Sequence, residues 1–440
     1  MAVWTPLTYI RTDNYFDSYR AEFVQGDHDI VVDTTTGLIL DIRASEEQLP
    51  GGAIEINLRG LTTSWDEQVT RESLAERTIR AVTHARTTLL AGFTAVRDLG
   101  TEGTGDADID LRKCISSPIS LIPGPRYFCA SRAIVSTGSY GPRNKLHPNE
   151  QGVQGVTGAQ IADGNDDCMR VVRQQVGAGV DWIKVVPTDY RHRANVSQTS
   201  PQTGVKSIPL WTQSELKTMI TTAHSLGVKV AMHVDAAGPA YEALEMGVDS
   251  LEHGSKYDHT VLSKLRLQGA WWCPTLSVFE DYSKGDKWDS LQKIFKYALE
   301  ENAKLSHDPD EGIRIACGSD IGAFTHGENA RELKLMRSLG MPANCVLQAA
   351  TWNGWRCIRS MEWEGVQGEA RLEEQMKNPV AMGDNEIPFG RLMRGFAADI
   401  IASRGSFQEG SSFDEAVEPD SVVFVMKGGK VYKENGRSVV

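Results

Sequence analysis

A series of short apolar runs, each followed by a helical pattern, constrains the fold of this chain more than any other feature. The runs span residues 94–99, 127–131, 183–186, 229–234, 250–253, 271–276 and 314–319. The clearest helical pattern between them, at 216–226, is bounded by a capping box of Thr212 and Glu215 and by Gly227. Repeated βα units form a parallel sheet covered by helices, so the series predicts an α/β fold of the (β/α)8 TIM-barrel type.

The first strand of such a barrel is the one that the sequence supplies least clearly. The run 53–60 is the only candidate, and it fits equally well as the last strand of a small β domain. Residues 1–58 and 393–440 both carry short alternating runs with tight turns, which predicts that the two termini share one small β domain. The barrel would then occupy residues 59–392, with a polar insertion at 362–390.

Charge and cysteine usage exclude several classes of partner. Acidic residues outnumber basic ones by 58 to 46 without any Lys/Arg-rich block, which argues against a nucleic acid or an anionic membrane as partner. No run approaches the ~20 apolar residues of a membrane span, and the first ten residues lack a leader pattern. The 7 cysteines form no CxxC pair, which favours free thiols in a reducing compartment. We therefore expect a cytoplasmic protein.

Four side chains that can hold a metal ion lie at the ends of these runs: Lys184, His233, His253 and Asp320. Each alone has a structural explanation, as an ion-paired lysine, a core histidine or a helix-capping aspartate. Together they mark the carboxyl ends of strands in one βα series, which is the face where barrel sites are built. Two imidazoles with an anionic oxygen suit a divalent ion such as zinc, which generates hydroxide near neutral pH. Asp320 could carry the proton to the leaving group.

Loops that follow the strands supply candidate substrate-binding residues, namely Tyr140, Tyr190, Arg191 and His326. The guanidinium of Arg191 has the geometry to hold a substrate carboxylate through two hydrogen bonds. An ordinary solvent loop around Tyr140 and a solvated surface histidine at position 326 are the alternatives for these two.

At these residues the chain resembles the amidohydrolase superfamily, closest to the branch of imidazolonepropionase-like proteins, Xaa-Pro dipeptidases and ochratoxinase-type amidases. The resemblance covers roughly residues 66–432, and its most specific parts are the runs 91–98, 179–185, 251–254, 318–320 and 397–400. It implies that Lys184 is carboxylated and bridges two metal ions, that His233 and His253 bind the second ion, and that Asp320 is both ligand and proton shuttle.

One departure from this family matters most: the chain has no His-x-His motif, which in the family ends strand one and holds the first metal. Either strand one is absent after residue 60, or Pro50 and Gly51 align with the family's Pro-Gly, which puts Ile56 and Leu58 where the histidines belong. In both alignments the first metal site loses two ligands. We therefore expect one ion rather than two, and a carbamate on Lys184 would lose one of its neutralising cations.

These observations predict a metal-dependent hydrolase that cleaves an amide, peptide-like or cyclic amide bond in a small molecule. The alternatives are a lyase, decarboxylase or isomerase on the same barrel, and a catalytically degenerate homologue that binds a small molecule or a partner chain. A faulty splice product or gene model would carry the same gap. Because a barrel that lacks strand one exposes sheet edges, we also expect a homo-oligomer or a covering N-terminal segment.

Overall fold

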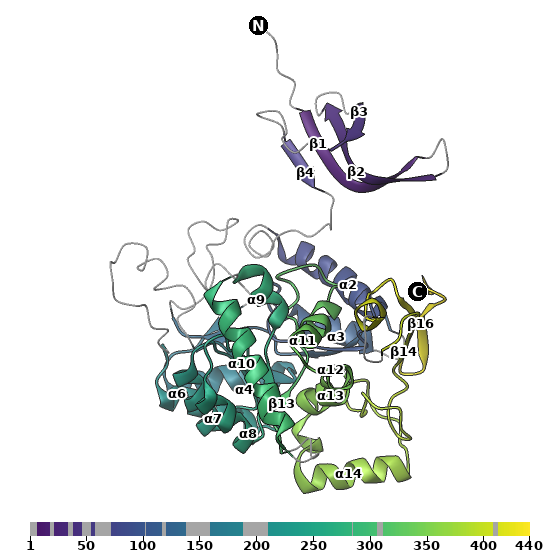
Figure 1. Ribbon diagram of the computed structural model, residues 1–440. Helices are drawn as coiled ribbons and strands as arrows, with labels where there is room; N and C mark the ends of the chain where they lie inside the picture. Colours follow the sequence, from purple (N-terminus) through teal and green to yellow (C-terminus); the bar gives the residue numbers. More distant parts are fainter. Residues whose placement is uncertain are drawn as a thin grey trace, which may run out of the picture. The chain divides into compact units, whose positions relative to one another are not determined.

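The computed structural model describes residues 7–17, 22–33, 38–45, 54–57, 72–101, 103–116, 120–137, 159–187, 210–283, 285–305, 311–407 and 412–440. The chain divides into two compact units, Met1–Thr63 and Ser64–Val440 (Figure 1). Within the described ranges, no helix is both long and apolar enough to cross a bilayer. The 7 cysteines are all free, which confirms that part of the prediction.

The first unit contains a four-stranded sheet in the order β3-β2-β1-β4. Its strands are β1 (Leu7–Asp17), β2 (Glu22–Asp33), β3 (Leu38–Ala44) and β4 (Ile54–Asn57). The first three form antiparallel hairpins, as their alternating sequence predicts. Strand β4 pairs in parallel with β1, where Thr8 lies opposite Ile54. The candidate for barrel strand one therefore belongs to this sheet, which is one of the two places that the sequence allows it.

The second unit is built on parallel strands, seven of which match the predicted runs. These are β5 (Ala95–Asp98), β6 (Arg126–Cys129), β9 (Trp182–Val185), β10 (Lys229–His233), β11 (Ser250–Glu252), β12 (Trp271–Cys273) and β13 (Arg314–Ile315). Two further strands, β7 (Ala133–Val135) and β8 (Ala159–Ile161), were not predicted. One sheet has the order β13-β12-β11-β10-β9-β7-β8, while β5 pairs with β6. Two runs fall furthest short of their predicted length. The run 271–276 leaves the ladder after Cys273, and 314–319 pairs only through its first two residues.

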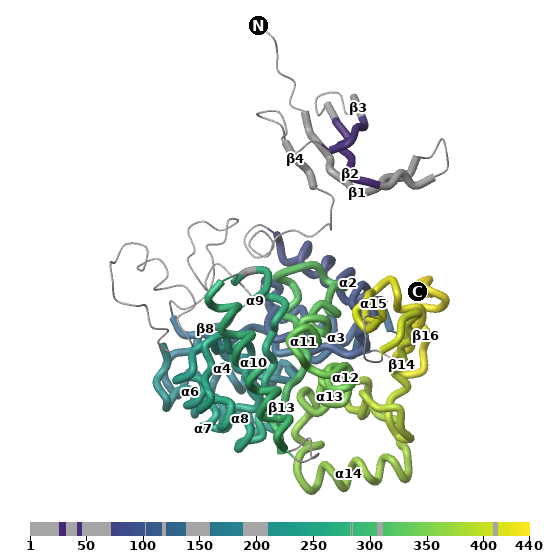
Figure 2. Tube along the Cα trace, in the orientation of Figure 1, coloured from purple at the N-terminus to yellow at the C-terminus, as the bar shows by residue number. Residues whose placement is uncertain are grey.

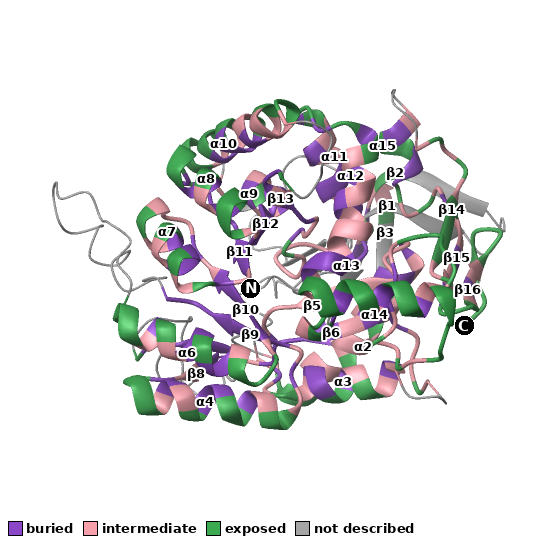
Figure 3. Ribbon diagram, turned by 90° about the horizontal axis from the view of Figure 1, so that it is seen from below, coloured by how far each residue is buried: buried purple, intermediate pink, exposed green. Residues whose placement is uncertain are grey.

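Helices surround these strands (Figure 1). They include α2 (Leu74–Leu90), α3 (Ala107–Ser116), α4 (Asn165–Ala178), α6 (Gln213–Ser225), α7 (Ala237–Met246), α8 (His259–Gln268), α9 (Leu276–Tyr282), α10 (Asp286–Ala303), α11 (Ala330–Ser338), α12 (Ala343–Ala350) and α13 (Trp352–Ile358). Helix α6 begins with the predicted capping box of Thr212 and Glu215, and it buries Leu216 and Met219. Burial is nearly complete along strands β9 to β11, where Figure 3 shows nearly continuous purple. The core therefore lies between these strands and their helices.

No described strand fills the strand-one position of the barrel. In the part of the chain that the structure describes, β5 pairs only with β6, and β13 pairs only with β12. All four residues of β5 are half-buried, whereas those of β9 are fully buried. On the β13 side the open edge is partly covered, because Cys317 N donates to Ala349 O at 3.1 Å and Asn353 Nδ2 donates to Ile315 O at 3.2 Å. The strands agree with the predicted TIM-like barrel, and the absence of strand one stays a prediction.

The C-terminal strands β14 (Ile400–Ser403), β15 (Val422–Lys427), β16 (Lys430–Glu434) and β17 (Arg437–Ser438) form a second four-stranded sheet. This sheet packs on α2, with Leu89 buried against Val422 and Tyr432, and Figure 2 shows β16 beside that helix. The predicted polar insertion at 362–390 contains η2 (Met361–Trp363) and α14 (Gly365–Lys377). The sheets at the two ends of the chain have separate ladders over their described residues, and a β domain shared by 1–58 and 393–440 stays a prediction.

Candidate metal centre

The four metal-ligand candidates line one cavity of about 1330 Å³. Lys184 lies in β9, His233 is the last residue of β10, His253 follows β11, and Asp320 lies beyond β13. Because β9, β10 and β11 are adjacent parallel strands, their carboxyl ends meet at one rim of the barrel. The fold therefore brings residues that are far apart in the sequence to the same space.

The imidazoles of His233 and His253 lie edge to face, with ring centroids 4.4 Å apart and an interplanar angle of 65°. His233 is half-buried and His253 is 7% exposed. Burial, and next the positive charge of Lys184, lowers the pKa of His233 to about 4. Burial, followed by the neighbouring His233, also lowers the pKa of His253 well below its usual value. Both rings are therefore neutral at pH 7, which is the form of histidine that binds metals.

The backbone around the cavity is strained at three of its rim positions. His253, Thr275 and Asp320 have φ values of 75°, 51° and 56°, although none is a glycine. They follow β11, β12 and β13, which are neighbouring strands. Left-handed conformations of such residues cost about 1–3 kcal/mol each and cluster at functional sites, where surrounding contacts impose them. The strain at this rim therefore marks it independently of the sequence motifs.

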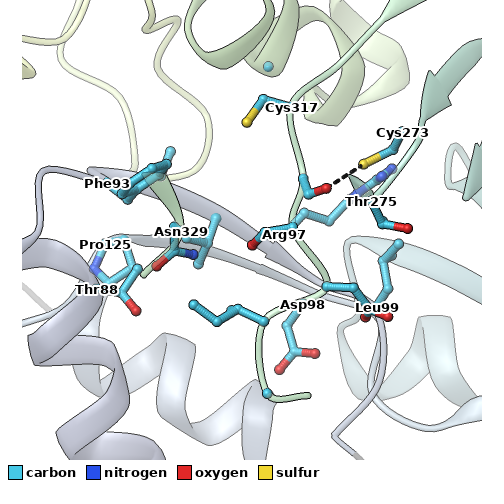
Figure 4. Close-up of a pocket in the computed structure, with 18 of the residues that line it drawn as sticks. Thr88, Phe93, Arg97, Asp98, Leu99, Pro125, Cys273, Thr275, Cys317 and Asn329 are labelled. Carbon is cyan, nitrogen blue, oxygen red and sulfur yellow. Dashed lines mark hydrogen bonds between the residues drawn. The ribbon is translucent and has the colours of Figure 1, made fainter. Parts of the chain in front are cut away.

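Lys184 is 6% exposed, and its burial is the main cause of a lowered pKa. The nearby carboxylates of Glu252 and Asp320 act in the opposite direction. Glu252 is itself paired with Arg97, whose Nη2 lies 2.8 Å from Glu252 Oε1 and whose guanidinium stacks over the ring of Trp182. Figure 4 shows Arg97 within the pocket. Arg97, which lies in the half-buried β5, was not predicted as a site residue.

Asp320 lines the cavity but does not join the two imidazoles in a ready-made cluster. Over the described ranges, no three His, Cys, Asp or Glu side chains gather closely enough to hold a metal ion. Two neutral imidazoles are a suitable partial ligand set, and Lys184 on the neighbouring strand is the third candidate. An uncharged amine is a poor ligand for zinc, whereas a carbamate on the same nitrogen would supply anionic oxygens. The residues present therefore fit one ion if Lys184 is carboxylated.

His326 lines the same cavity, where its ring stacks on that of His84 with centroids 3.9 Å apart. Sequence reasoning missed His84, which lies on the inward face of α2 together with the buried Ala85 and Thr88. The other predicted substrate-binding residues, Tyr140, Tyr190 and Arg191, lie outside the described residues.

Comparison with known proteins shows which family has this architecture. A family model described as the amidohydrolase family matches residues 52–360, which is more than half of the chain. The chain belongs to the amidohydrolase family. This family member is 26% identical over 370 residues to the ochratoxinase of Aspergillus niger, in an alignment that covers 78% of this chain and 66% of that protein. It therefore spans slightly less than two thirds of that relative's length.

Solved structures of the family share the fold. A Xaa-Pro dipeptidase with methionine bound in its active site matches with a TM-score of 0.61 and 25% identity, covering 97% of this chain and 100% of that one. The A. niger ochratoxinase structure also gives a TM-score of 0.61, at 21% identity, over 98% of this chain and 96% of that one. The family model confirms the predicted family, and these likenesses confirm the TIM-like barrel with an additional small domain.

Proposed function

We propose that this protein is a metal-dependent hydrolase that cleaves an amide, peptide-like or cyclic amide bond in a small molecule. The observation that carries the proposal is the pair of neutral imidazoles, His233 and His253, with ring centroids 4.4 Å apart in the cavity that Lys184 also lines. Membership of the amidohydrolase family and the likeness to an ochratoxinase and a Xaa-Pro dipeptidase support it.

In this proposal Lys184, His233 and His253 hold one divalent ion, with zinc as the first candidate. Such an ion, when bound, supplies Lewis acidity toward a carbonyl oxygen and lowers the pKa of a water molecule. The neutral imidazoles need not lose a proton before they bind it. Carboxylation would convert the buried amine of Lys184 into an anionic oxygen ligand. Only one ion is expected, because no His-x-His motif is present for a second.

Asp320 is the proposed proton carrier. Its carboxylate is exposed within the cavity, on the rim that also holds the two imidazoles. Hydrolysis of an amide requires that the attacking water lose a proton and that the departing nitrogen gain one. A carboxylate at this rim can accept the first proton and return it to the nitrogen, which is general base and then general acid catalysis. Asp320 as an additional metal ligand stays a prediction from the family resemblance.

The cavity is large enough for a small-molecule substrate, because its volume of about 1330 Å³ is greater than the roughly 300–1,000 Å³ of most ligand pockets. His84 and His326 lie on the side of α2 and the loop after β13, where they can contact the part of a substrate that is remote from the reacting bond. A homo-oligomeric state and a cytoplasmic location stay predictions from the sequence.

Metal content and turnover test the proposal together. Protein loaded with zinc and freed of excess ion is expected to retain about one equivalent per chain, as a three-ligand site predicts. The substitutions His233→Ala and His253→Ala are expected to abolish both bound zinc and hydrolysis of a panel of N-acyl amino acids, Xaa-Pro dipeptides and aryl amides. His259→Ala is the matched control, because this exposed imidazole packs on Tyr297 at the surface.

The outcomes separate the candidate functions. Two equivalents of zinc would contradict the single site, and no bound zinc would favour the degenerate binding homologue. Hydrolysis that survives in both histidine variants would exclude the metal mechanism. Bound zinc with no hydrolysis of any C–N bond in the panel would instead favour a lyase, decarboxylase or isomerase.

A further inference from the structure

The turn after strand β12 holds a β-branched residue in a backbone conformation that such residues rarely adopt. Thr275 has a φ of 51° and is 4% exposed. A left-handed backbone at a β-branched residue is a genuine outlier, and it persists only where the surrounding contacts impose it. The hydrogen bonds that hold this turn are made with Glu332 on helix α11, which is distant in sequence.

Glu332 is fully buried, and its carboxylate accepts three hydrogen bonds from this turn. The backbone N–H of Leu276 donates to Oε1 at 2.9 Å. The N–H and the hydroxyl of Ser277 both donate to Oε2, at 2.8 Å and 2.7 Å. Burial raises the pKa of the Glu332 carboxyl to about 7, and the donors from Ser277 and Leu276 act in the opposite direction. The two residues after Thr275 are therefore fixed by one side chain.

The same turn contacts the imidazole of His253. Thr275 Oγ1 lies 2.8 Å from His253 Nδ1, and Trp272 Nε1 donates to the backbone oxygen of His253 at 2.6 Å. We propose that Glu332 is a positioning residue that acts through Thr275. Glu332 fixes the turn so that the hydroxyl oxygen of Thr275 accepts a hydrogen bond from the Nδ1–H of His253. Nε2 of His253 is then unprotonated and can bind a metal ion.

This arrangement determines which nitrogen of His253 is available to a metal ion. A histidine binds a metal through a nitrogen without a proton, and the hydrogen bond of the other nitrogen decides which one that is. Glu332 is not among the described residues that line the cavity. Apart from repulsion between its carboxylate and that of Asp320, its contacts with the site run through the turn. The expected gain in metal affinity rests on the proposed function, whereas the orientation of the ring does not.

The orientation can be measured without any metal. In metal-free protein labelled with ¹⁵N-histidine, the resonances of His253 are identified by their loss in His253→Gln. We expect a protonated Nδ1 and an unprotonated Nε2 in the unsubstituted protein. Thr275→Val, which keeps the shape of threonine without its hydroxyl, and Glu332→Gln should both give a mixture of tautomers. Thr275→Ser should restore the single form. Unchanged His253 resonances in both Thr275→Val and Glu332→Gln would overturn the proposal.

Zinc affinity, measured by competition with a chromophoric chelator, tests the consequence. We expect Thr275→Val to raise the Kd for zinc about 10- to 100-fold, as loss of a hydrogen bond to a ligating histidine does, and Thr275→Ser to restore the affinity. The matched control is Gln375→Ala. The buried side chain of Gln375 forms hydrogen bonds with the backbone of Val380 and Gly395, and none of these residues lines the cavity. It should lower the melting temperature and leave the Kd unchanged.

These measurements distinguish the two proposals. If the unsubstituted protein binds no zinc, the proposed function fails, and the tautomer measurement alone still decides the role of Glu332. If it binds zinc and Thr275→Val binds equally well, the positioning role is overturned while the proposed function stands. A Kd that rises as much in Gln375→Ala as in Thr275→Val would also overturn the positioning role, because it would reflect stability alone.

Discussion

The ring of His84, on helix α2, stacks on the ring of His326, which follows strand β13, with centroids 3.9 Å apart and an interplanar angle of 16°. Helix α2 leads into β5, and β5 and β13 flank the strand-one position, which no described strand fills. The adjoining Gly327 also approaches α2 closely, because a Cβ there would lie 2.8 Å from Thr87 Cγ2. Helix α2 and the loop after β13 therefore pack together beside the strand-one position of the barrel.

This ring pair predicts a loss of stability in acid. Burial, and next the charge of Arg80, lowers the pKa of His84 to about 4. Burial and then His84 lower that of His326 to about 3. The unfolded chain titrates near pH 6.5, so it binds protons that the folded chain does not bind. The stability contributed by the neutral rings is therefore complete above pH 6.5 and is lost as the pH falls toward 4.

Replacement of His84 tests this pH dependence. We expect His84→Gln to lower the melting temperature at pH 7.5 modestly, because the stacking is lost. Between pH 7.5 and pH 5, however, its melting temperature should fall by less than that of the unsubstituted protein, since one proton-sensitive group is gone. The exposed His259 provides the control, and His259→Gln should keep the original slope. Identical slopes for all three proteins would refute this account of the ring pair.

The buried pair of Arg97 and Glu252 predicts a large effect on stability. Their side chains are only 8% and 4% exposed, and Ser250 Oγ also donates to Glu252 Oε1 at 2.5 Å. Removal of Arg97 leaves the buried carboxylate of Glu252 without its ion-pair partner, so Arg97→Met should lower the free energy of unfolding by about 3–5 kcal/mol. The double variant Arg97→Met with Glu252→Gln should recover part of that loss.

Chemical denaturation measures both losses, with Lys113→Met as the surface control. Lys113 and Asp110 also form an ion pair, but their side chains are 65% and 76% exposed. Exposed pairs contribute roughly 0–1 kcal/mol, so this change should be nearly neutral. A comparable loss in Lys113→Met and Arg97→Met would show that the burial of Arg97 does not matter.

The sequence predicted seven of the parallel strands because buried parallel strands are short apolar runs with helical patterns between them. It did not predict β7 and β8, which have only three residues each. It could not decide where residues 53–60 pair. Ile54 and Ile56 alternate with polar residues, and that pattern fits either a barrel or a small sheet until a partner strand is known. The boundary at 271–276 was wrong because Leu276 is apolar in either element, whereas the turn at Thr275 depends on contacts with Glu332.

The residues of the candidate site were likewise predicted only in part. His233, His253 and Lys184 were predicted because their place at strand ends is visible in the sequence, and the structure puts them around one cavity. Thr275 and Glu332 were not predicted, because nothing in their own sequence neighbourhoods indicates that a helix 55 residues away holds the turn. Long-range hydrogen bonds of this kind follow from packing, which a local pattern does not encode.

Two glycines allow a matched test of space beside the site. Gly254, which follows His253, has a φ of 109°, and a Cβ there would lie 2.4 Å from the ring of Tyr257. Gly247 has a similar φ of 91°, with nothing within 4 Å of a Cβ. Gly247→Ala should therefore lower the free energy of unfolding by about 1–3 kcal/mol through backbone strain alone.

Gly254→Ala should lower it further and also weaken zinc binding. Tyr257 is buried and donates to Val234 O at 3.1 Å, so its ring cannot simply move into solvent. The backbone at His253 must shift instead. Denaturation gives the stability of both variants, and chelator competition gives their zinc Kd. Equal effects of the two substitutions on both quantities would show that contact with Tyr257 has no influence on the site.

The last prediction separates the two roles of Asp320, as a metal ligand and as a proton carrier. Asp320 lines the cavity without forming a three-residue cluster with the imidazoles, so Asp320→Asn should retain its zinc. The amide cannot accept the proton of water, and kcat should fall about 10²- to 10⁴-fold, the range of general acid–base catalysis. Asp110→Asn, an exposed change on α3, should leave kcat and zinc unaltered. Loss of zinc together with activity would instead identify Asp320 as a metal ligand, because a carboxylate that only carries protons is not needed to hold the ion.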